Sequence, residues 1–418
     1  ALMAHYLNAN VVERVQVVSG GSGDEMLRFE AMWQRVSSYL PPSRVAELRT
    51  RFEIISGFEE LHSAVALVFD ASPEELKPQI LAQGWSVRPS LNFASISERP
   101  GLFDARARVA RQLENDELRR RLIVIQPHIG IAAGKEWQVT DIEILFTKST
   151  GYNLLATARE MAQRAGQRLT FPRNSGGYFA YAVFAPVAAE AIRMLSEGET
   201  PDRVDAAATV VFGNPLLPLI DFFGTQQLRD RIRVVQAELG EDFGCEVPPL
   251  LLELVDRGFL GSVFSPLVGG IRMCSDTGVG EPTPLVRATF EGRVGAGGEM
   301  GILESRLRIA FARAAVRAYQ AGVIQFAPGA DALIRHAFGF SIGPFEMISD
   351  REPSGFASII AEGDALAGSV PGGERFRFSR GARGLVSPGH ALNERLSVPF
   401  VWASFDDWMR STFGAARG

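Results

Sequence analysis

A glycine-rich turn near the start of the chain has the residue types that bind a pyrophosphate. Residues 11–18 are rich in valine, which predicts a strand, and the turn 19–24, with the sequence SGGSGD, follows directly. A turn of the form G-x-G-x-x-G between a strand and a helix lets the backbone and the helix N-terminus approach the phosphates of a dinucleotide. Gly20, Gly21 and Gly23 are therefore the predicted cofactor-binding residues.

The same turn departs from that pattern. In register with G-x-G-x-x-G, the three glycine positions hold Ser19, Gly21 and Asp24, so only Gly21 matches. Asp24 and Glu25 carry negative charge at the predicted helix N-terminus, which suits the helix dipole but repels a phosphate. Apolar residues at helical spacing fill 27–40, where the pattern needs a strand ending in an acid that holds the adenosine ribose. A dinucleotide is therefore expected to bind weakly or not at all.

Two ionisable residues lie in or beside predicted strands further along the chain. Glu143 stands inside the β-branched run 139–146, where an ionised carboxylate is costly unless it has a partner. His128 follows the predicted strand 119–125. A histidine works as a base near neutral pH when a partner sets its orientation and its pKa.

Composition limits the classes of protein and partner that fit. The chain has 418 residues, enough for two or three domains, and its 46% hydrophobic and 22% charged residues are typical of a soluble globular protein. A net charge of −5 gives no reason to expect nucleic acid as a partner. Cys245 and Cys274 lie outside any metal-ligand spacing, so no metal site is predicted. Reduced cysteines, no signal peptide and no apolar run long enough to span a bilayer predict a cytoplasmic protein.

The middle of the chain carries a strong helical pattern. Residues 178–195 form one apolar helical segment, and Thr200-Pro201 then supplies an N-cap with proline at the first helical position. A second helix over 205–212 ends at Gly213, and 216–223 predicts a short, buried third helix. Long apolar helices joined by short turns predict an all-α module of the kind that often forms dimers.

This pattern resembles the C-terminal domain of the 3-hydroxyacyl-CoA dehydrogenases of fatty-acid β-oxidation. In that family the domain has the approximate sequence pattern DSPGFIxNR, then a helix, an acidic segment, and fGxPmGPfeLxDxxG. The matching segments here are 174–182, Glu197-Gly198, Val204-Asp205, 212–215 and 221–224. The pattern recurs in Ala330-Asp331 and 338–350, so the resemblance implies a second helical domain of the same kind.

The resemblance implies a fold of the α/β plus all-α class, built like the dehydrogenase half of multifunctional β-oxidation enzymes. A shortened Rossmann-like nucleotide-binding domain is expected over 1–149, a first helical C-terminal domain over 150–285, and a second over 286–418 with an extended tail. NAD is the implied cofactor, with binding weak or lost because of the altered turn. An acyl-CoA thioester is the implied partner, and a homodimer or a subunit of a β-oxidation assembly is the expected state.

The resemblance also implies roles for single residues. In the family a His takes the hydroxyl proton of the substrate, a Glu orients and charges that His, and a Ser and an Asn hold the substrate oxygen. Glu143 matches the Glu and Ser95 matches the Ser. Strict alignment puts Gln126 at the His position and Tyr181 at the Asn position. His128 follows two residues after Gln126, on the same face of a strand, so His128, Glu143 and Ser95 are the predicted catalytic residues. The alternative is a loop histidine and a glutamate on a solvated strand face.

Two functions stay open on this basis. The first is a working enzyme that oxidises 3-hydroxyacyl-CoA to 3-ketoacyl-CoA with NAD. The second is a catalytically degenerate relative that serves as an acyl-CoA-binding or scaffold subunit. The helical motifs favour the family in either case. The altered glycine turn, the missing ribose acid, the shifted His128 and Tyr181 favour the second.

Overall fold

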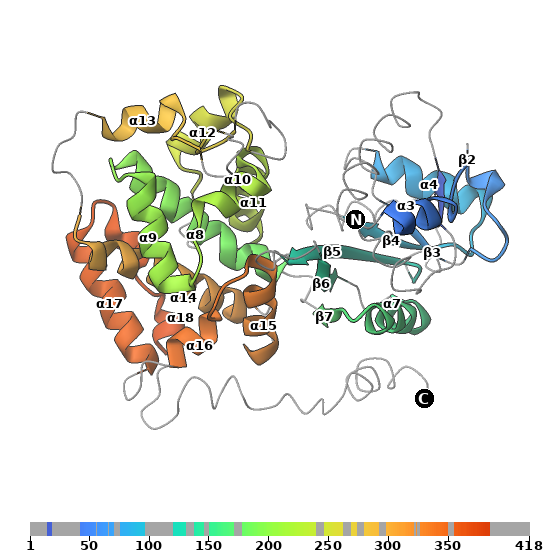
Figure 1. Ribbon diagram of the computed structural model, residues 1–418. Helices are drawn as coiled ribbons and strands as arrows, with labels where there is room; N and C mark the ends of the chain where they lie inside the picture. Colours follow the sequence, from blue (N-terminus) through green and yellow to red (C-terminus); the bar gives the residue numbers. More distant parts are fainter. Residues whose placement is uncertain are drawn as a thin grey trace. The chain divides into compact units, whose positions relative to one another are not determined.

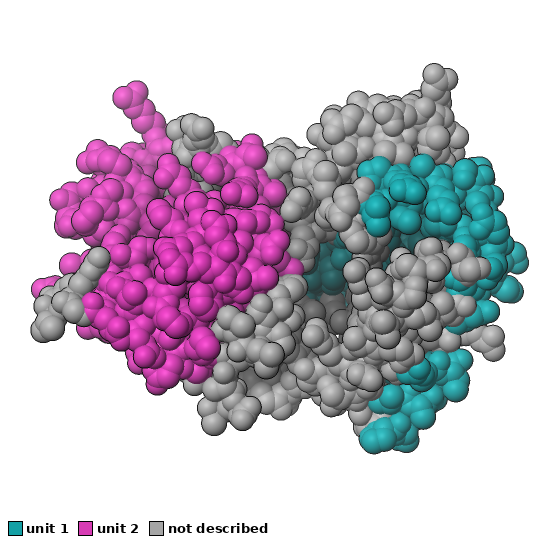
Figure 2. Space-filling view, turned by 90° about the horizontal axis from the view of Figure 1, so that it is seen from above, with its two compact units in different colours: residues 1–174, 408–418 teal, residues 175–407 magenta. Residues whose placement is uncertain are grey.

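The computed structural model divides the chain into two compact units (Figure 2). Unit 1 contains residues 1–174 and 408–418, and unit 2 contains residues 175–407. The residues that the structure describes are 15–18, 42–55, 57–65, 67–70, 76–96, 120–130, 138–145, 150–170, 178–239, 246–261, 269–273, 280–291, 298–321, 323, 327–349 and 355–384.

Unit 1 is built on a five-stranded mixed sheet with the order β3-β4-β5-β6-β7 (Figure 1). The strands are β3 (Leu67–Asp70), β4 (Asn92–Ile96), β5 (Leu122–Gly130), β6 (Gln138–Leu145) and β7 (Arg168–Thr170). The pairs β3–β4, β4–β5 and β6–β7 are parallel, whereas β5 and β6 are antiparallel. A separate parallel pair is formed by β1 (Val15–Val18) and β2 (Phe52–Ile55). The described helices of unit 1 are α3 (Pro42–Arg49), η1 (Phe58–Glu60), α4 (Lys77–Val87) and α7 (Tyr152–Arg164).

The limits of this sheet differ from those expected. β5 runs to Gly130, although the strand pattern in the sequence ends at residue 125. β7 is a three-residue strand that the sequence pattern does not reveal, and it pairs with β6. Unit 1 continues to residue 174 and includes α7 and β7, whereas the first domain expected from the sequence ends at residue 149.

An apolar cluster anchors β4 and β5 in unit 1. Phe93 and Leu122, which are paired between these strands, pack with Phe58, Leu81 and Trp85 in one buried cluster. The ring centroids of Trp85 and Phe93 lie 5.3 Å apart in an edge contact. The indole Nε1 of Trp85 donates a 3.0 Å hydrogen bond to the carbonyl of Leu91, so its polar atom is satisfied inside the core. This packing fixes the strands whose carboxyl ends form the candidate site.

Unit 2 is helical in its described part (Figure 1). Its helices are α8 (Phe179–Ser196), α9 (Pro201–Phe212), α10 (Leu217–Phe223), α11 (Thr225–Leu239), α12 (Pro249–Asp256), α13 (Pro284–Phe290), α14 (Met300–Gln320), α15 (Ala327–Phe338), α16 (Pro344–Ser349), α17 (Gly355–Ser369), η4 (Gly373–Phe376) and α18 (Arg380–Arg383). The three helices expected over 178–223 are confirmed as α8, α9 and α10. The predicted N-cap is also present, since Thr200 accepts a hydrogen bond from the backbone N–H of Arg203.

Helix α8 is the central helix of unit 2. Its 18 residues are long and apolar enough for a membrane span, but 89% of this window is buried inside the protein. The bent pair α9–α10 passes the same test as a combined segment. Burial of α8 against α14 and α11 accounts for its apolar composition as a core helix.

Helices α8 to α11 and α14 to α17 have matching lengths in the same order. The first four contain 18, 12, 7 and 15 residues, and the second four contain 21, 12, 6 and 15. In each set an aspartate accepts hydrogen bonds from backbone N–H groups at the start of the short third helix. Asp205 accepts from Leu216 and Leu217 at 3.0 and 2.9 Å. Asp331 accepts from Phe345 and Glu346 at 2.8 and 3.1 Å. The two sets of helices thus share their order, similar lengths and one aspartate contact, and their relation as two domains stays a prediction.

The two sets of helices meet at their Phe-Gly turns. Gly213 and Gly339 both have positive φ, 76° and 67°, which ends α9 and α15 in the same way. The backbone N–H of Ser341 donates to the carbonyl of Phe212 at 2.7 Å. The rings of Phe212 and Phe340 are stacked with centroids 4.6 Å apart. Both sets of helices therefore belong to one compact unit, unit 2.

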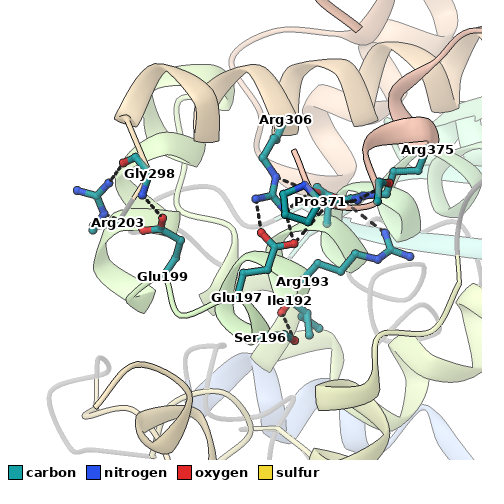
Figure 3. Close-up of polar contacts among 12 residues, drawn as sticks. Ile192, Arg193, Ser196, Glu197, Glu199, Arg203, Gly298, Arg306, Pro371 and Arg375 are labelled. Atoms are coloured by element: carbon teal, nitrogen blue, oxygen red, sulfur yellow. Dashed lines mark hydrogen bonds and ion pairs between the residues drawn. The ribbon is translucent and has the colours of Figure 1, made fainter. Parts of the chain in front are cut away.

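A buried carboxylate joins the two sets of helices at a second place. Glu190 of α8 is 1% exposed and accepts hydrogen bonds from Arg306 of α14 and Arg375 of η4. Arg306 also pairs with Glu197, just past the end of α8 (Figure 3). Burial alone would raise the pKa of Glu190, but the hydrogen bond from Arg375 and the charges of these arginines hold it below its usual value.

Candidate active site

The carboxyl ends of three strands place polar side chains on one face of the sheet in unit 1. Asp70, the last residue of β3, is paired with Ser95 of β4, and Ser95 is paired with Val124 of β5. Side chains of paired residues share a face, and every second residue along a strand returns to that face. Asp70, Ser95 and Gln126 therefore share one face near the carboxyl edge, where ligands bind in open α/β sheets.

The antiparallel pairing of β5 with β6 continues this face. Gln126 is paired with Glu143, and His128 is paired with Asp141. His128 Nε2 lies 2.8 Å from Glu143 Oε2, a diagonal contact between the two neighbouring pairs. Asp141 turns to the other neighbour of β6 and forms an ion pair with Arg168 of β7 at 3.1 Å. We call the bonded pair of His128 and Glu143 the dyad.

Burial gives the dyad its chemical character. His128 is 4% exposed and Glu143 is 0% exposed. A buried carboxylate needs a hydrogen-bonding partner, and the imidazole supplies one. The carboxylate in turn fixes the ring orientation and favours the tautomer with its proton on Nε2. His128 lies inside β5 and Glu143 is fully buried, so a loop histidine with a solvated glutamate does not describe this geometry.

Ser95 is placed in a different buried group. Its hydroxyl donates a 2.7 Å hydrogen bond to Asp70 Oδ2, and Ser95 is 0% exposed. Lys77, at the start of α4, lies 3.4 Å from the same carboxylate oxygen and donates to the Asp70 carbonyl at 3.2 Å. Ser95 shares the face of the dyad but is hydrogen-bonded to Asp70.

Asp70 was not among the site residues predicted from the sequence. The sequence signal for it is an acidic residue at the end of a strand, followed by a lysine on the next helix.

The predicted cofactor site comprises the glycine turn and the carboxyl edge of the sheet. Gly20, Gly21 and Gly23 lie outside the described residues. At the carboxyl edge, the amide oxygen of Gln126 is buried without a hydrogen-bond partner among the described residues. An unmatched acceptor beside the dyad fits the amide-bearing nicotinamide end of NAD. No group of three or more His, Cys, Asp or Glu side chains in the described part is arranged to hold a metal.

Tyr181, at the family's Asn position, belongs to unit 2. It lies in the first turn of α8 and is 6% exposed. The guanidinium carbon of Arg231, from α11, lies 3.3 Å from the centroid of the Tyr181 ring. This cation–π contact packs the ring against α11 within unit 2.

Comparison with known proteins identifies the helical segment. Residues 177–263 match the family model described as 3-hydroxyacyl-CoA dehydrogenase, C-terminal domain. This segment is similar to the 3-hydroxyacyl-CoA dehydrogenase C-terminal domain. The resemblance found in the sequence is thereby confirmed, and the match includes the whole of helices α8 to α12.

Solved structures of 3-hydroxyacyl-CoA dehydrogenases share the fold over a larger part of the chain. A 3-hydroxybutyryl-CoA dehydrogenase from Escherichia coli is 16% identical, with a TM-score of 0.69, over 91% of this chain and 94% of that one. The dehydrogenase part of multifunctional enzyme 1 from C. elegans is also 16% identical, with a TM-score of 0.59, over 91% and 86% of the two chains. These matches confirm the predicted fold class, a Rossmann-like α/β domain joined to helical domains.

Proposed function

We propose that this protein is an NAD-dependent 3-hydroxyacyl-CoA dehydrogenase that interconverts 3-hydroxyacyl-CoA and 3-ketoacyl-CoA. The buried dyad carries the proposal, because a histidine bonded to a carboxylate at the carboxyl edge of the sheet is the arrangement that an alcohol oxidation needs. Fatty-acid β-oxidation in the cytoplasm is the setting that this reaction implies, with acyl-CoA thioesters as substrates. A homodimer or a subunit of a β-oxidation assembly remains part of the proposal.

In the proposed reaction, His128 is the base that takes the proton and Glu143 stabilises the charge that His128 then carries. In the oxidation direction, the O–H bond of the 3-hydroxyl group breaks and its proton passes to His128 as the C=O bond forms. Because Nε2 faces Glu143, the proton is taken by Nδ1. The Glu143 carboxylate then stabilises the imidazolium, as an opposite charge at hydrogen-bonding distance does. NAD, if bound beside the dyad, would supply the acceptor for the hydride that leaves the hydroxyl-bearing carbon.

The group around Ser95 has a supporting role in this proposal. The Ser95 proton is directed at Asp70, so Ser95 can meet a substrate only through its oxygen lone pairs or after its hydroxyl rotates. The buried Lys77 neutralises Asp70 and holds the start of α4 against the end of β3.

The second candidate, a degenerate acyl-CoA-binding or scaffold subunit, has its own supporting observations. Ser95 is engaged by Asp70, and Tyr181, which replaces the family's Asn, is packed under Arg231. Both groups that the family uses to hold the substrate oxygen are thus altered or occupied. This candidate predicts acyl-CoA binding without turnover.

Acetoacetyl-CoA reduction, followed by loss of NADH absorbance, separates the two candidates. The wild-type protein should turn over, and His128→Ala should lower kcat by about 10²- to 10⁴-fold, the usual contribution of a positioned acid–base group. Glu143→Gln should lower kcat less, while acetoacetyl-CoA binding stays unchanged in both variants. His62→Ala, which removes an exposed histidine of unit 1, is the matched control and should retain full activity. Activity that survives His128→Ala would remove the dyad from the mechanism, and wild-type binding without turnover would favour the second candidate.

A further inference from the structure

Gln126 has a buried side-chain oxygen that finds no hydrogen-bond donor among the described residues, on the face of the sheet that carries the dyad. The residue is 7% exposed, and its amide nitrogen donates a 3.1 Å hydrogen bond to the carbonyl of Pro127. Its amide oxygen Oε1 is buried and has no hydrogen-bond partner in the part of the chain that the structure describes. The orientation of the amide is fixed by this arrangement, because a flipped amide would bring its oxygen against the Pro127 carbonyl.

The acceptor lies where the reaction would take place. Gln126 is directly opposite Glu143 in the pairing of β5 with β6, and it precedes His128 by two residues on the same face. A buried acceptor without a donor is unfavourable in the free protein. A ligand that supplies a donor at this position therefore gains binding energy that a ligand without one does not.

The identity of the donor follows by elimination, on the basis of the proposed function. The reacting oxygen of a 3-hydroxyacyl group has a single proton, and the dyad takes it. The oxidised 3-keto group has no proton to donate, and neither does the thioester carbonyl. The other group that must lie against the reacting carbon is the ring that accepts the hydride, and this ring bears a carboxamide with two N–H bonds. We infer that Gln126 Oε1 accepts a hydrogen bond from the nicotinamide carboxamide and selects for cofactors that carry that amide.

This contact gives the nicotinamide end a larger share of cofactor binding than the adenosine end. The glycine turn matches the dinucleotide pattern at Gly21 alone, and the sequence shows no acid for the adenosine ribose. Because contacts to the pyrophosphate and the adenosine ribose are reduced, the affinity for the cofactor depends on contacts near the nicotinamide ring. Gln126 is therefore a positioning residue that orients the ring and a specificity residue for its substituent.

The test compares binding of two nucleotides rather than turnover. NADH carries the carboxamide, whereas the reduced 3-acetylpyridine analogue of the dinucleotide keeps the carbonyl and replaces the NH₂ with a methyl group. Calorimetric titration should show that the wild-type protein binds NADH about tenfold more tightly than the analogue, the effect of one buried hydrogen bond. Gln126→Met, which keeps length and burial but removes the acceptor, should bring this ratio close to one by weakening NADH alone.

Gln167→Met is the matched control. Gln167 is 5% exposed, and both polar atoms of its amide are also buried without partners among the described residues. It lies where α7 leads into β7, with its backbone N–H bonded to the carbonyl of Ala162, and not on the strand of the dyad. This variant should retain the tenfold preference.

Each outcome decides the inference. A tenfold preference that persists in Gln126→Met, or that disappears equally in Gln167→Met, overturns it. If circular dichroism shows that Gln126→Met is unfolded, equal binding of the two nucleotides by the wild-type protein overturns it, and a clear preference for NADH supports it. A wild-type protein that reduces acetoacetyl-CoA but shows no preference contradicts only the role of Gln126. A protein that neither binds NADH nor turns over contradicts the proposed function as well.

Discussion

Replacing Glu190 with glutamine should destabilise the helical unit strongly. Glu190 accepts three short hydrogen bonds from guanidinium groups, at 2.7 Å from Arg306 and at 2.8 and 2.9 Å from Arg375. The Arg306 side chain is 5% exposed, so loss of the carboxylate leaves a buried cation whose remaining charged partner among the described residues is Glu197. Breaking a buried ion pair by removing one partner costs about 3–5 kcal/mol. Because a glutamine oxygen still accepts one hydrogen bond and Glu197 remains, we expect about 3 kcal/mol.

The pH dependence of this effect has a definite sign. The pKa of Glu190 is lowered in the folded protein, so its stabilising contribution is present above the pKa of the unfolded chain and is lost as pH falls through the folded value. The difference between wild type and Glu190→Gln should therefore be full at pH 7 and should shrink in acid, below the ordinary glutamate range.

Urea unfolding followed by far-ultraviolet circular dichroism measures the effect, since unit 2 supplies most of the described helix. Glu253→Gln is the matched control, because Glu253 pairs with Arg257 on the surface of α12, with side-chain exposures of 46% and 62%. An exposed pair of this type contributes at most about 1 kcal/mol. If Glu190→Gln and Glu253→Gln lower the free energy of unfolding by the same small amount, the network does not hold the two sets of helices together as reasoned here.

Two further predictions concern the helical repeats. Burial raises the pKa of Asp331 to about 7, so the free energy of unfolding should fall as pH rises from about 4, the unfolded pKa, to above 7. Asp331→Asn should flatten this pH dependence in unfolding midpoints measured between pH 5 and 8. An unchanged pH dependence would show that Asp331 is not its source. Gly213→Ala should destabilise the protein by more than about 1 kcal/mol, because φ is +76° and the new Cβ would lie 2.7 Å from Ser341. Gly301→Ala, in α14 with no atom within 4 Å of the new Cβ, should instead leave stability unchanged or raise it by up to about 1 kcal/mol, as chemical unfolding of both variants would show.

The helical half of the fold could be predicted from sequence because its signals are local. The apolar run of α8, the Thr200-Pro201 start of α9 and the glycine at its end each act within a few residues. The sheet could be predicted less well. β7 has only three residues, which is too short for a periodic pattern, and β5 continues past residue 125 through Gln126 and Pro127, which do not read as strand residues. The extension of β5 places His128 within a strand.

The candidate site was predictable in its residue types and not in its contacts. Glu143 could be singled out because a carboxylate in a β-branched run needs a partner. The contact of Ser95 with Asp70 depends on the parallel pairing of β3 with β4, and the unmatched oxygen of Gln126 depends on a hydrogen bond to its neighbour. Neither pairing register nor amide orientation has a signal in a single sequence.

The two-residue period of a β-strand explains why His128 can contact Glu143 although the resemblance places the family's His at position 126. Moving the histidine by one residue from position 126 would have turned it to the opposite face of the sheet, away from Glu143. Moving it by two keeps the face and shifts it about 6.6 Å along the strand, toward the carboxyl edge. Diagonal neighbours on paired antiparallel strands lie within reach of long side chains, and the 2.8 Å contact of His128 with Glu143 is such a pair. The position directly opposite Glu143, where the resemblance places the family's His, holds Gln126, which cannot act as a base but can accept a hydrogen bond. In the proposed mechanism the base therefore lies nearer the carboxyl edge, and Gln126 supplies the acceptor proposed to bind the cofactor amide.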